Sequence, residues 1–164
     1  MGEKCLEKEV WKLVMDNIAW HYSPVHASDF FIRADLSCYG MPGRFEQLWV
    51  KKVSDRTFEI CCIPFFTYGI ALRDVVETDE SFTFQRTILK RGHKILRIAV
   101  ASERTQEQIH LVLRDWVQNS GLLYEWFSEG YLAVDLPTAF EGQSSFFILD
   151  DLERNGEISM ETVE

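Results

Sequence analysis

Four histidines and one adjacent pair of aspartates are the side chains of this 164-residue sequence best suited to acid–base or metal chemistry. The histidines are His21, His26, His93 and His110. A metal or general-base site would need two of them to converge with a carboxylate, and no short spacing brings such a set together. Asp150 and Asp151 fall in an expected helix, where adjacent positions do not face each other, so we expect a solvated helix face. These residues predict neither a catalytic site nor a metal site.

The short motifs that identify common enzyme sites are absent from the sequence. The GxSxG nucleophile elbow, the GxxxxGK[ST] phosphate loop, the dinucleotide-binding glycine pattern and HExxH do not occur. The cysteines Cys5, Cys38, Cys61 and Cys62 form neither a CxxC pair nor a disulfide framework, so we expect reduced, buried and inert thiols. The sequence therefore favours a protein that is not an enzyme and has no cofactor.

Charge is distributed unevenly along the chain. The formal net charge is −9, and residues 101–164 carry 3 Lys and Arg against 13 Asp and Glu, a net charge of −10. An acidic surface repels phosphate backbones and anionic membranes and speeds association with cationic partners, although the acids can equally be ordinary solubilising charge. We expect no direct nucleic-acid partner and no membrane partner. Because no apolar run resembles a secretion signal or a membrane span, the sequence predicts a cytoplasmic protein.

The first half of the chain, residues 1–90, is expected to contain one helix followed by strands. Apolar residues recur at three- and four-residue steps over residues 3–20, which predicts an amphipathic helix that ends at Ser23-Pro24. Alternating β-branched and aromatic residues predict strands at 29–36, 45–53, 57–63, 74–78 and 81–90. We therefore expect an N-terminal helix and a bent antiparallel sheet or partial barrel.

The second half, residues 91–164, alternates strands with helices. The expected elements are a strand at 94–100, a helix at 105–120, strands at 122–127 and 131–136, a helix at 144–154 and a strand at 157–163. Thr105 with Gln108 predicts a capping box for the first of these helices, and Gly121 predicts its end. The β-α-β-β-α-β order is the ferredoxin-like pattern, so the fold class is α+β. We expect the two halves to pack as one compact unit.

Three segments of the sequence resemble a bacterial family of unknown function. They are residues 48–50 (LWV), 64–76 (PFFTYGIALRDVV) and 91–97 (RGHKILR). The family carries a PFFxYGxxxxDVV signature followed by a GHxTLR-like segment, from which this sequence departs at Lys94-Ile95. The signature has a structural explanation: Phe65 and Phe66 supply core, Gly69 permits a bend, and Asp74 caps exposed backbone amides.

Some members of this family look like toxin-immunity proteins. The resemblance therefore implies that this chain is an immunity protein too. The acidic C-terminal third, residues 101–164, then predicts where a toxin would bind, through acids and aromatic anchors. The candidate toxin-binding residues are Glu125, Trp126, Glu129, Asp135, Phe140, Glu141, Asp150 and Asp151. Our leading hypothesis is an immunity protein that covers the cationic active site of a cognate antibacterial toxin, expected to be a nuclease (RNase) of a contact-dependent or polymorphic toxin system.

Two other classes of protein are left open by the sequence. One is a small-molecule-binding regulatory domain, because ferredoxin-like domains often bind ligands at their sheet or dimer surfaces. A ligand-dependent melting shift would favour that class. The other is an enzyme whose site is assembled from dispersed residues such as His93, Asp74 and Tyr68.

Overall fold

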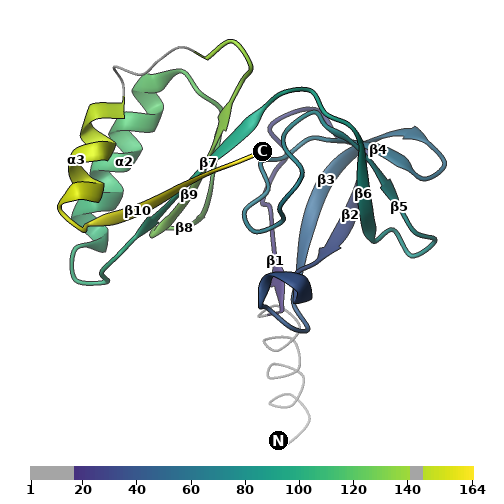
Figure 1. Cartoon of the computed structure of the whole chain (residues 1–164), viewed down its shortest axis with the longest axis horizontal. Coiled ribbons are helices and arrows are strands. Elements are labelled where there is room, and N and C mark those ends of the chain that lie inside the picture. Colours follow the sequence, from purple (N-terminus) through teal and green to yellow (C-terminus); the bar gives the residue numbers. More distant parts are fainter. Residues whose placement is uncertain (1–16, 141–145) are drawn as a thin grey trace, which may run out of the picture.

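The computed structural model describes residues 17–140 and 146–164, which form two sheets and two α-helices (Figure 1). The elements of the first part are β1 (Ile18–Ala19), β2 (Phe30–Asp35), the 3-10 helix η1 (Ser37–Tyr39), β3 (Phe45–Ser54), β4 (Thr57–Ile60), β5 (Val75–Thr78) and β6 (Phe84–Leu89). The elements of the second part are β7 (Lys94–Val100), α2 (Gln106–Ser120), β8 (Tyr124–Ser128), β9 (Tyr131–Leu136), α3 (Phe147–Arg154) and β10 (Ile158–Val163).

The first sheet is strongly bent. Its strands follow the order β1-β3-β4-β5-β6, with β2 also paired to β3, and all pairs are antiparallel except β1 with β3. The bend brings β2 to the segment that leads into β6, where the Arg33 amide donates to the carbonyl oxygen of Phe82 at 3.1 Å. Bulges in the β3–β4 and β5–β6 pairs supply the extra local twist that such a bend needs. Its core consists of Ile32, Ala34, Leu48, Val50, Phe58, Ile60, Cys62, Ile70 and Val76.

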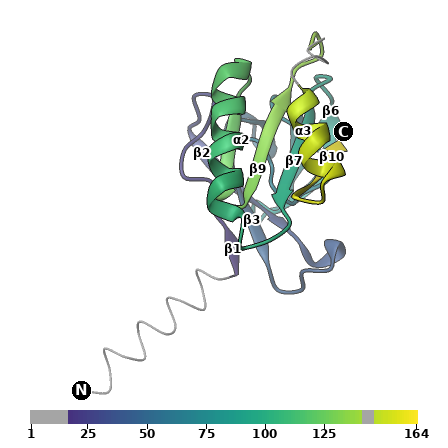
Figure 2. The same cartoon turned by 90° about the vertical axis from the view of Figure 1, so that its left-hand side faces the viewer.

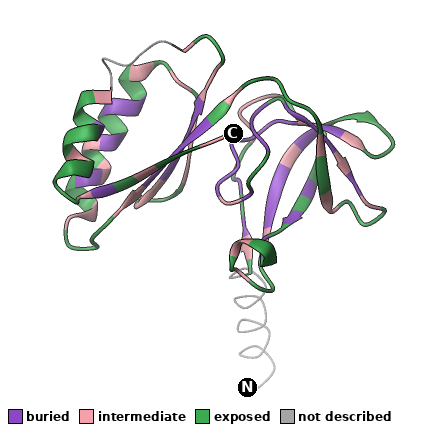
Figure 3. Cartoon of the chain, in the orientation of Figure 1, coloured by how far each residue is buried: buried purple, intermediate pink, exposed green. Residues whose placement is uncertain are grey.

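The second sheet is antiparallel, in the order β10-β7-β9-β8, and carries α2 and α3 on one face (Figure 2). The core between the helices and the sheet consists of Leu96, Ile98, Ile109, Leu113, Trp116, Val117, Leu132, Val134, Leu149 and Ile158. The helices bury one stripe against the sheet and expose the opposite one (Figure 3). No helix within the described residues has the length and apolar character needed to cross a bilayer.

Both faces of the second sheet are covered, and this decides which side chains meet the first sheet. Successive residues of a strand point to opposite faces. In β7, Leu96 and Ile98 therefore pack under the helices, whereas Ile95 and Arg97 point toward the first half of the chain. The core between the two sheets consists of Ile63, Phe65, Ala71, Ile95 and Ala133. The two sheets therefore share a packed apolar interface.

Most predicted elements are found, with three corrections. Residues 3–16 of the predicted N-terminal helix lie outside the described part of the chain, and residues 18–19, which the same prediction included, form strand β1. The capping box is wrong, because Thr105 makes no side-chain capping bond and its hydroxyl donates instead to the carbonyl oxygen of Ser102 at 3.4 Å. The strand predicted at 57–63 ends at Ile60, and the following residues enter the loop between the sheets. Gly121 ends α2 in the left-handed conformation, at φ 72°, as predicted.

Candidate functional site

The loop of residues 64–69, which contains the first part of the PFFxYG pattern, lies between the two sheets. Phe65 is 1% exposed and belongs to the core that the two sheets share. A loop in this position carries backbone N–H and C=O groups that no strand partner satisfies, and each would be costly to bury without a hydrogen bond. The surrounding side chains therefore have to satisfy them, and both sheets contribute.

Glu46, on strand β3, binds the amides of this loop. Its Oε2 accepts from the Thr67 amide at 2.8 Å, the Phe66 amide at 3.2 Å and the Thr67 hydroxyl at 2.6 Å. Its Oε1 accepts from the Phe65 amide. Glu46 is 0% exposed, so this buried carboxylate is satisfied by the loop and fixes the loop to the first sheet.

The second sheet binds the carbonyl oxygens of the same loop. Arg97, on β7, donates from Nη2 to the carbonyl oxygens of Thr67 at 2.6 Å and Pro64 at 3.2 Å. Tyr131, on β9, donates its hydroxyl to the carbonyl oxygen of Phe65 at 2.8 Å. One sheet thus holds the N–H side of the loop and the other holds its C=O side.

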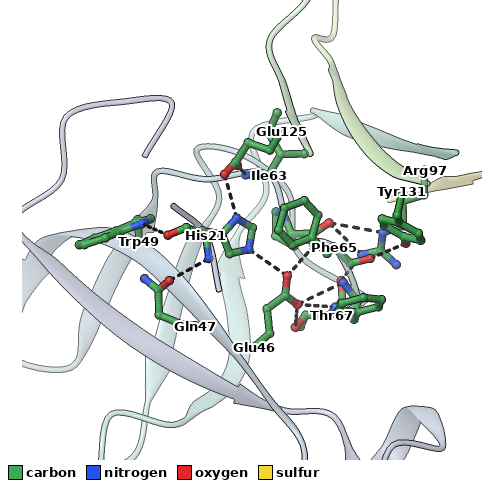
Figure 4. Close-up of polar contacts among 12 residues, drawn as sticks. His21, Glu46, Gln47, Trp49, Ile63, Phe65, Thr67, Arg97, Glu125 and Tyr131 are labelled. Atoms are coloured by element: carbon green, nitrogen blue, oxygen red, sulfur yellow. Dashed lines mark hydrogen bonds and ion pairs between the residues drawn. The ribbon is translucent and has the colours of Figure 1, made fainter. Parts of the chain in front are cut away.

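His21 joins the two sheets directly (Figure 4). Its Nε2 lies 3.0 Å from Glu46 Oε1 of the first sheet, and its Nδ1 lies 2.9 Å from Glu125 Oε1 of the second. Because both ring nitrogens face carboxylate oxygens, both donate, which requires the protonated imidazolium. The ring also stacks on Phe65, with ring centroids 4.2 Å apart. The group of His21, Glu46, Glu125, Arg97 and the 64–69 loop is hereafter the inter-sheet network.

The electrostatics of this network keep His21 charged. Burial alone would lower the pKa of His21, but the hydrogen bonds and charges of Glu125 and Glu46 outweigh burial and raise the pKa to about 9. For Glu46, burial opposes ionisation, and the His21 cation together with the Thr67 and Phe65 donors brings the pKa below its ordinary value. The buried pair is therefore ionic at neutral pH.

A metal is the other species that these donors could hold. His21, Cys62 and Glu125 place one ligand atom each within 4.8 Å of one another. Structural zinc takes four ligands and needs the thiolate of cysteine, whereas burial raises the pKa of Cys62 well above its ordinary value. The His21 nitrogens are also already bonded to carboxylates. The donor set therefore fits an ionic network better than a zinc site.

Asp74, the acid of the signature, caps backbone amides as the sequence predicts. Its carboxylate accepts from the amides of Ala71 at 3.0 Å and Arg91 at 2.7 Å, which ties the end of the loop region to the start of the second half. Asp74, Tyr68 and His93, named above for a dispersed enzyme site, form no hydrogen bond or ion pair with one another in the described part of the chain. Tyr68 donates to Glu161 and His93 bonds to Asp135, so Asp74, Tyr68 and His93 each have a different partner.

Two of the candidate toxin-binding acids are not free on the surface. Asp135 is 3% exposed and bonds to His93 Nδ1 at 2.8 Å, while Glu125 belongs to the inter-sheet network. Both point away from the helices because β8 and β9 alternate, with Trp126 and Val134 on the helix side. Glu125 and Asp135, predicted from the sequence as toxin-binding acids, are therefore bonded within the fold rather than free on its surface.

The other candidates that the structure describes lie on the helix side of the second sheet or at its edge. Trp126 is half-buried in the core under the helices and packs against His110, with ring centroids 4.5 Å apart, so it is a core residue rather than an exposed anchor. Phe140 is half-buried against Phe146. Glu129, Asp150 and Asp151 are exposed, and Glu141 lies outside the described residues.

The exposed side of α2 and α3 forms an apolar groove with acids beside it. The groove, of about 580 Å³, is lined by residues that include Leu111 and Asp115 of α2 and Ile148 of α3. Leu111 is 47% exposed, Ile148 43% and the neighbouring Phe147 70%. Large apolar side chains exposed together and bordered by charge are typical of protein-binding surfaces. This groove with Phe147, Asp150 and Asp151 is hereafter the helical face.

The fold and these contacts define an α+β protein of two packed sheets, in which buried charges hold a loop between them. The chain belongs to the family described as a domain of unknown function (DUF4265), whose sequence model matches residues 46–160. Among solved structures it is similar to a hypothetical protein from Neisseria gonorrhoeae, with 21% identity and a TM-score of 0.61, over 83% of this chain and 94% of that chain. At this identity the likeness shows the fold alone. No curated protein matches the chain.

Proposed function

We propose that this chain is a non-enzymatic immunity protein that binds a cationic toxin domain through its helical face. The observation that carries the proposal is the groove between α2 and α3, with exposed Leu111 and Ile148 and with Asp115 in its wall. An apolar centre beside acids suits a partner with apolar and basic side chains, such as the substrate-binding surface of a nuclease.

Charge supports a cationic partner. The described helices carry the exposed acids Glu107, Asp115, Asp150, Asp151 and Glu153 against the exposed bases Arg114 and Arg154. Asp151 is paired with Arg154 at 2.8 Å, whereas Asp115 and Asp150 form no ion pair with another residue in the described part of the chain. Unpaired surface carboxylates raise the association rate with a basic partner and make that rate depend on salt.

The proposal also includes the fold of each half of the chain and the cellular location of the protein. We assign the second half to the ferredoxin-like fold and the first to a partial barrel, supported by the order β7-α2-β8-β9-α3-β10 with the strand order β10-β7-β9-β8, and by the approach of β2 to β6. An inhibitor of a nuclease must meet its target in the cytoplasm, where the expected reduced thiols would persist.

Reversing the two unpaired acids is expected to weaken binding to the proposed cognate toxin, which we would seek first as the product of the adjacent gene. The double variant Asp115→Lys/Asp150→Lys should lower the association rate at least about tenfold at low salt, because each reversal replaces attraction by repulsion. Its control is Asp55→Lys/Glu80→Lys, which makes the same change in net charge on exposed hairpins of the first sheet. Stopped-flow association over a range of salt concentrations, together with toxin activity, measures the effect.

The two variants separate a local surface from a general effect of net charge. Slow association of the helical-face variant alone supports the proposal, and its salt dependence should also be smaller than that of the unaltered protein. Equal slowing of both variants would mean that only net charge matters. Unchanged association and full neutralisation by the helical-face variant would place the toxin on another surface.

A further inference from the structure

A second cleft, lined by other residues than the helical face, lies at the junction of the two halves. It has a volume of about 390 Å³, and its walls combine polar and apolar residues. The polar wall consists of His26, Arg73, His93 and Asp135. The other wall includes Gly121, Leu122, Leu123 and Pro137. Ionisable side chains from both halves of the chain therefore converge on one apolar surface, a combination typical of small-molecule sites.

Arg73 is held in a backbone conformation that its side chain does not favour. Its φ is 70°, in the left-handed region that is strained for any residue other than glycine. The Arg73 amide donates to the carbonyl oxygen of Ile60 at 2.9 Å, and the Asp74 amide donates to that of Ala71 at 3.2 Å. The turn is thus fixed on both sides, and it presents the guanidinium to the cleft.

The hydrogen bonds in the cleft leave donors available on its inner surface. Arg73 Nε donates to His26 Nε2 at 3.3 Å, and no bond of its two Nη groups to another described residue is found. Burial and the Arg73 charge lower the pKa of His26, consistent with a neutral ring that accepts this bond. His93 Nδ1 donates to Asp135 Oδ1 at 2.8 Å and Oδ2 at 3.0 Å, which leaves its Nε2 without a partner among the described residues.

We propose that this cleft binds a small organic anion, whose carboxylate or phosphate group accepts hydrogen bonds from the Arg73 guanidinium and, in the protonated form of the His93 ring, from His93 Nε2. The planar guanidinium offers paired N–H donors that match two oxygens of either group. Leu122, Leu123 and Pro137 would cover the apolar part of the ligand. Asp135 does not repel the anion strongly, because its carboxylate is already bonded to His93 and orients that ring.

A cation is the less suitable occupant of the same cleft. Its carboxylate, Asp135, is 3% exposed and directs both oxygens at His93 Nδ1. The atoms left to contact a ligand are guanidinium N–H groups and one imidazole nitrogen, and the guanidinium repels cations. The site therefore selects negative charge, and it does not depend on whether the helical face binds a toxin.

Titration with benzoate and phenyl phosphate, followed by NMR of the histidine rings, tests the proposal on the whole chain. We expect saturable shifts of the His93 and His26 signals with a Kd of about 1 mM or tighter for at least one anion, and none with the neutral analogue benzamide. Binding of benzoate alone would identify the carboxylate class, and binding of phenyl phosphate alone the phosphate class. Shifts that do not saturate, or equal shifts with benzamide, would overturn the proposal.

Two variants of Arg73 separate binding from folding. Arg73→Gln should weaken anion binding at least about tenfold, since it removes a charge-assisted pair, whereas Arg56→Gln, on an exposed hairpin, should not. Arg73→Gly should abolish binding and yet raise the Tm by about 2–4 °C, because glycine relieves the left-handed strain. Retained binding in both Arg73 variants would show that the guanidinium does not contact the ligand.

Discussion

Replacing Glu46 by alanine is expected to lower the free energy of unfolding by roughly 3–5 kcal/mol, the usual cost of removing one partner of a buried ion pair. The substitution leaves three loop amides without an acceptor and leaves the His21 cation buried beside one carboxylate instead of two. Both sheets should be affected, because the loop that loses its anchor is also bound by Arg97 and Tyr131 of the second sheet.

Urea unfolding followed by circular dichroism measures this effect, with two companion variants. Glu46→Gln keeps the shape and one acceptor oxygen but not the charge, so it should destabilise the protein less than alanine does. Glu80→Ala removes an exposed acid from the same half of the chain and should change the free energy of unfolding by no more than about 0.5 kcal/mol. A loss for Glu46→Ala as small as that for Glu80→Ala would refute the role assigned to the inter-sheet network.

Stability should also fall as the pH rises from about 6.5 to about 9, the ordinary and the folded pKa of His21. A histidine whose folded pKa is raised stabilises the folded state fully below its ordinary pKa, and this stabilisation is lost as the pH rises through the folded value. The shift corresponds to a loss on the order of 3 kcal/mol across this window. The expected result is a protein that is most stable in mildly acidic solution.

The other groups with shifted pKa values change the stability mainly outside this pH window. Glu46 has a lowered pKa, so its contribution is present above its ordinary value of 4.5 and is lost as the pH falls through the folded value. Burial raises the pKa of Cys61 to about 11, which destabilises the folded state only above the ordinary thiol value of 9. Because the pKa of His26 is lowered, His26 destabilises the folded state only below its ordinary pKa of 6.5. The range from 6.5 to 9 therefore reports mainly on His21.

Unfolding free energies measured across this pH range, for the unaltered protein and two histidine variants, test the prediction. His21→Gln cannot titrate, so its stability should be lower at pH 6.5 and nearly independent of pH up to 9. His110→Gln alters a histidine that bonds only to the carbonyl oxygen of Glu129 among the described residues, and it should keep the slope. If His21→Gln keeps the full slope as well, another group carries the pH dependence.

The proposed toxin interface has to be mapped with substitutions that leave the fold intact. The inter-sheet network lies between the sheets, so its substitutions weaken any function through folding and cannot locate a binding surface. Asp115 and Asp150 are exposed and can be changed with little cost in stability. Comparing unfolding free energy with association rate for each variant therefore separates the fold from the partner surface.

The order of strands and helices in the second half followed from the sequence alone. Strands β7 and β9 have the bounds that alternation predicted, 94–100 and 131–136, because apolar periodicity is a local property of neighbouring residues. The cap of Asp74 on nearby amides was also local, since one of its partners is Ala71, three residues away. Such features depend on short-range geometry that the residue types already specify.

One sequence feature indicates the inter-sheet network, although none of the predictions made use of it. Glu46 and Gln47 stand in a strand beside Leu48, Trp49 and Val50, and a carboxylate within such a run has to find a partner if it is buried. Its partners are His21, 25 residues earlier, and the loop amides about 20 residues later. Nothing in the spacing of these residues relates them.

Only the tertiary structure decided which acids are free. Glu125 and Asp135 have the same local pattern as exposed strand acids, but Glu125 bonds to His21, 104 residues earlier, and Asp135 bonds to His93, 42 residues earlier. Whether a charge is solvated or paired depends on segments distant in sequence, because burial and ion pairing are long-range properties of the packed chain. The sequence by itself thus determined the elements and the overall charge, whereas the packing of the two sheets determined which charges hold the fold and which remain for a partner.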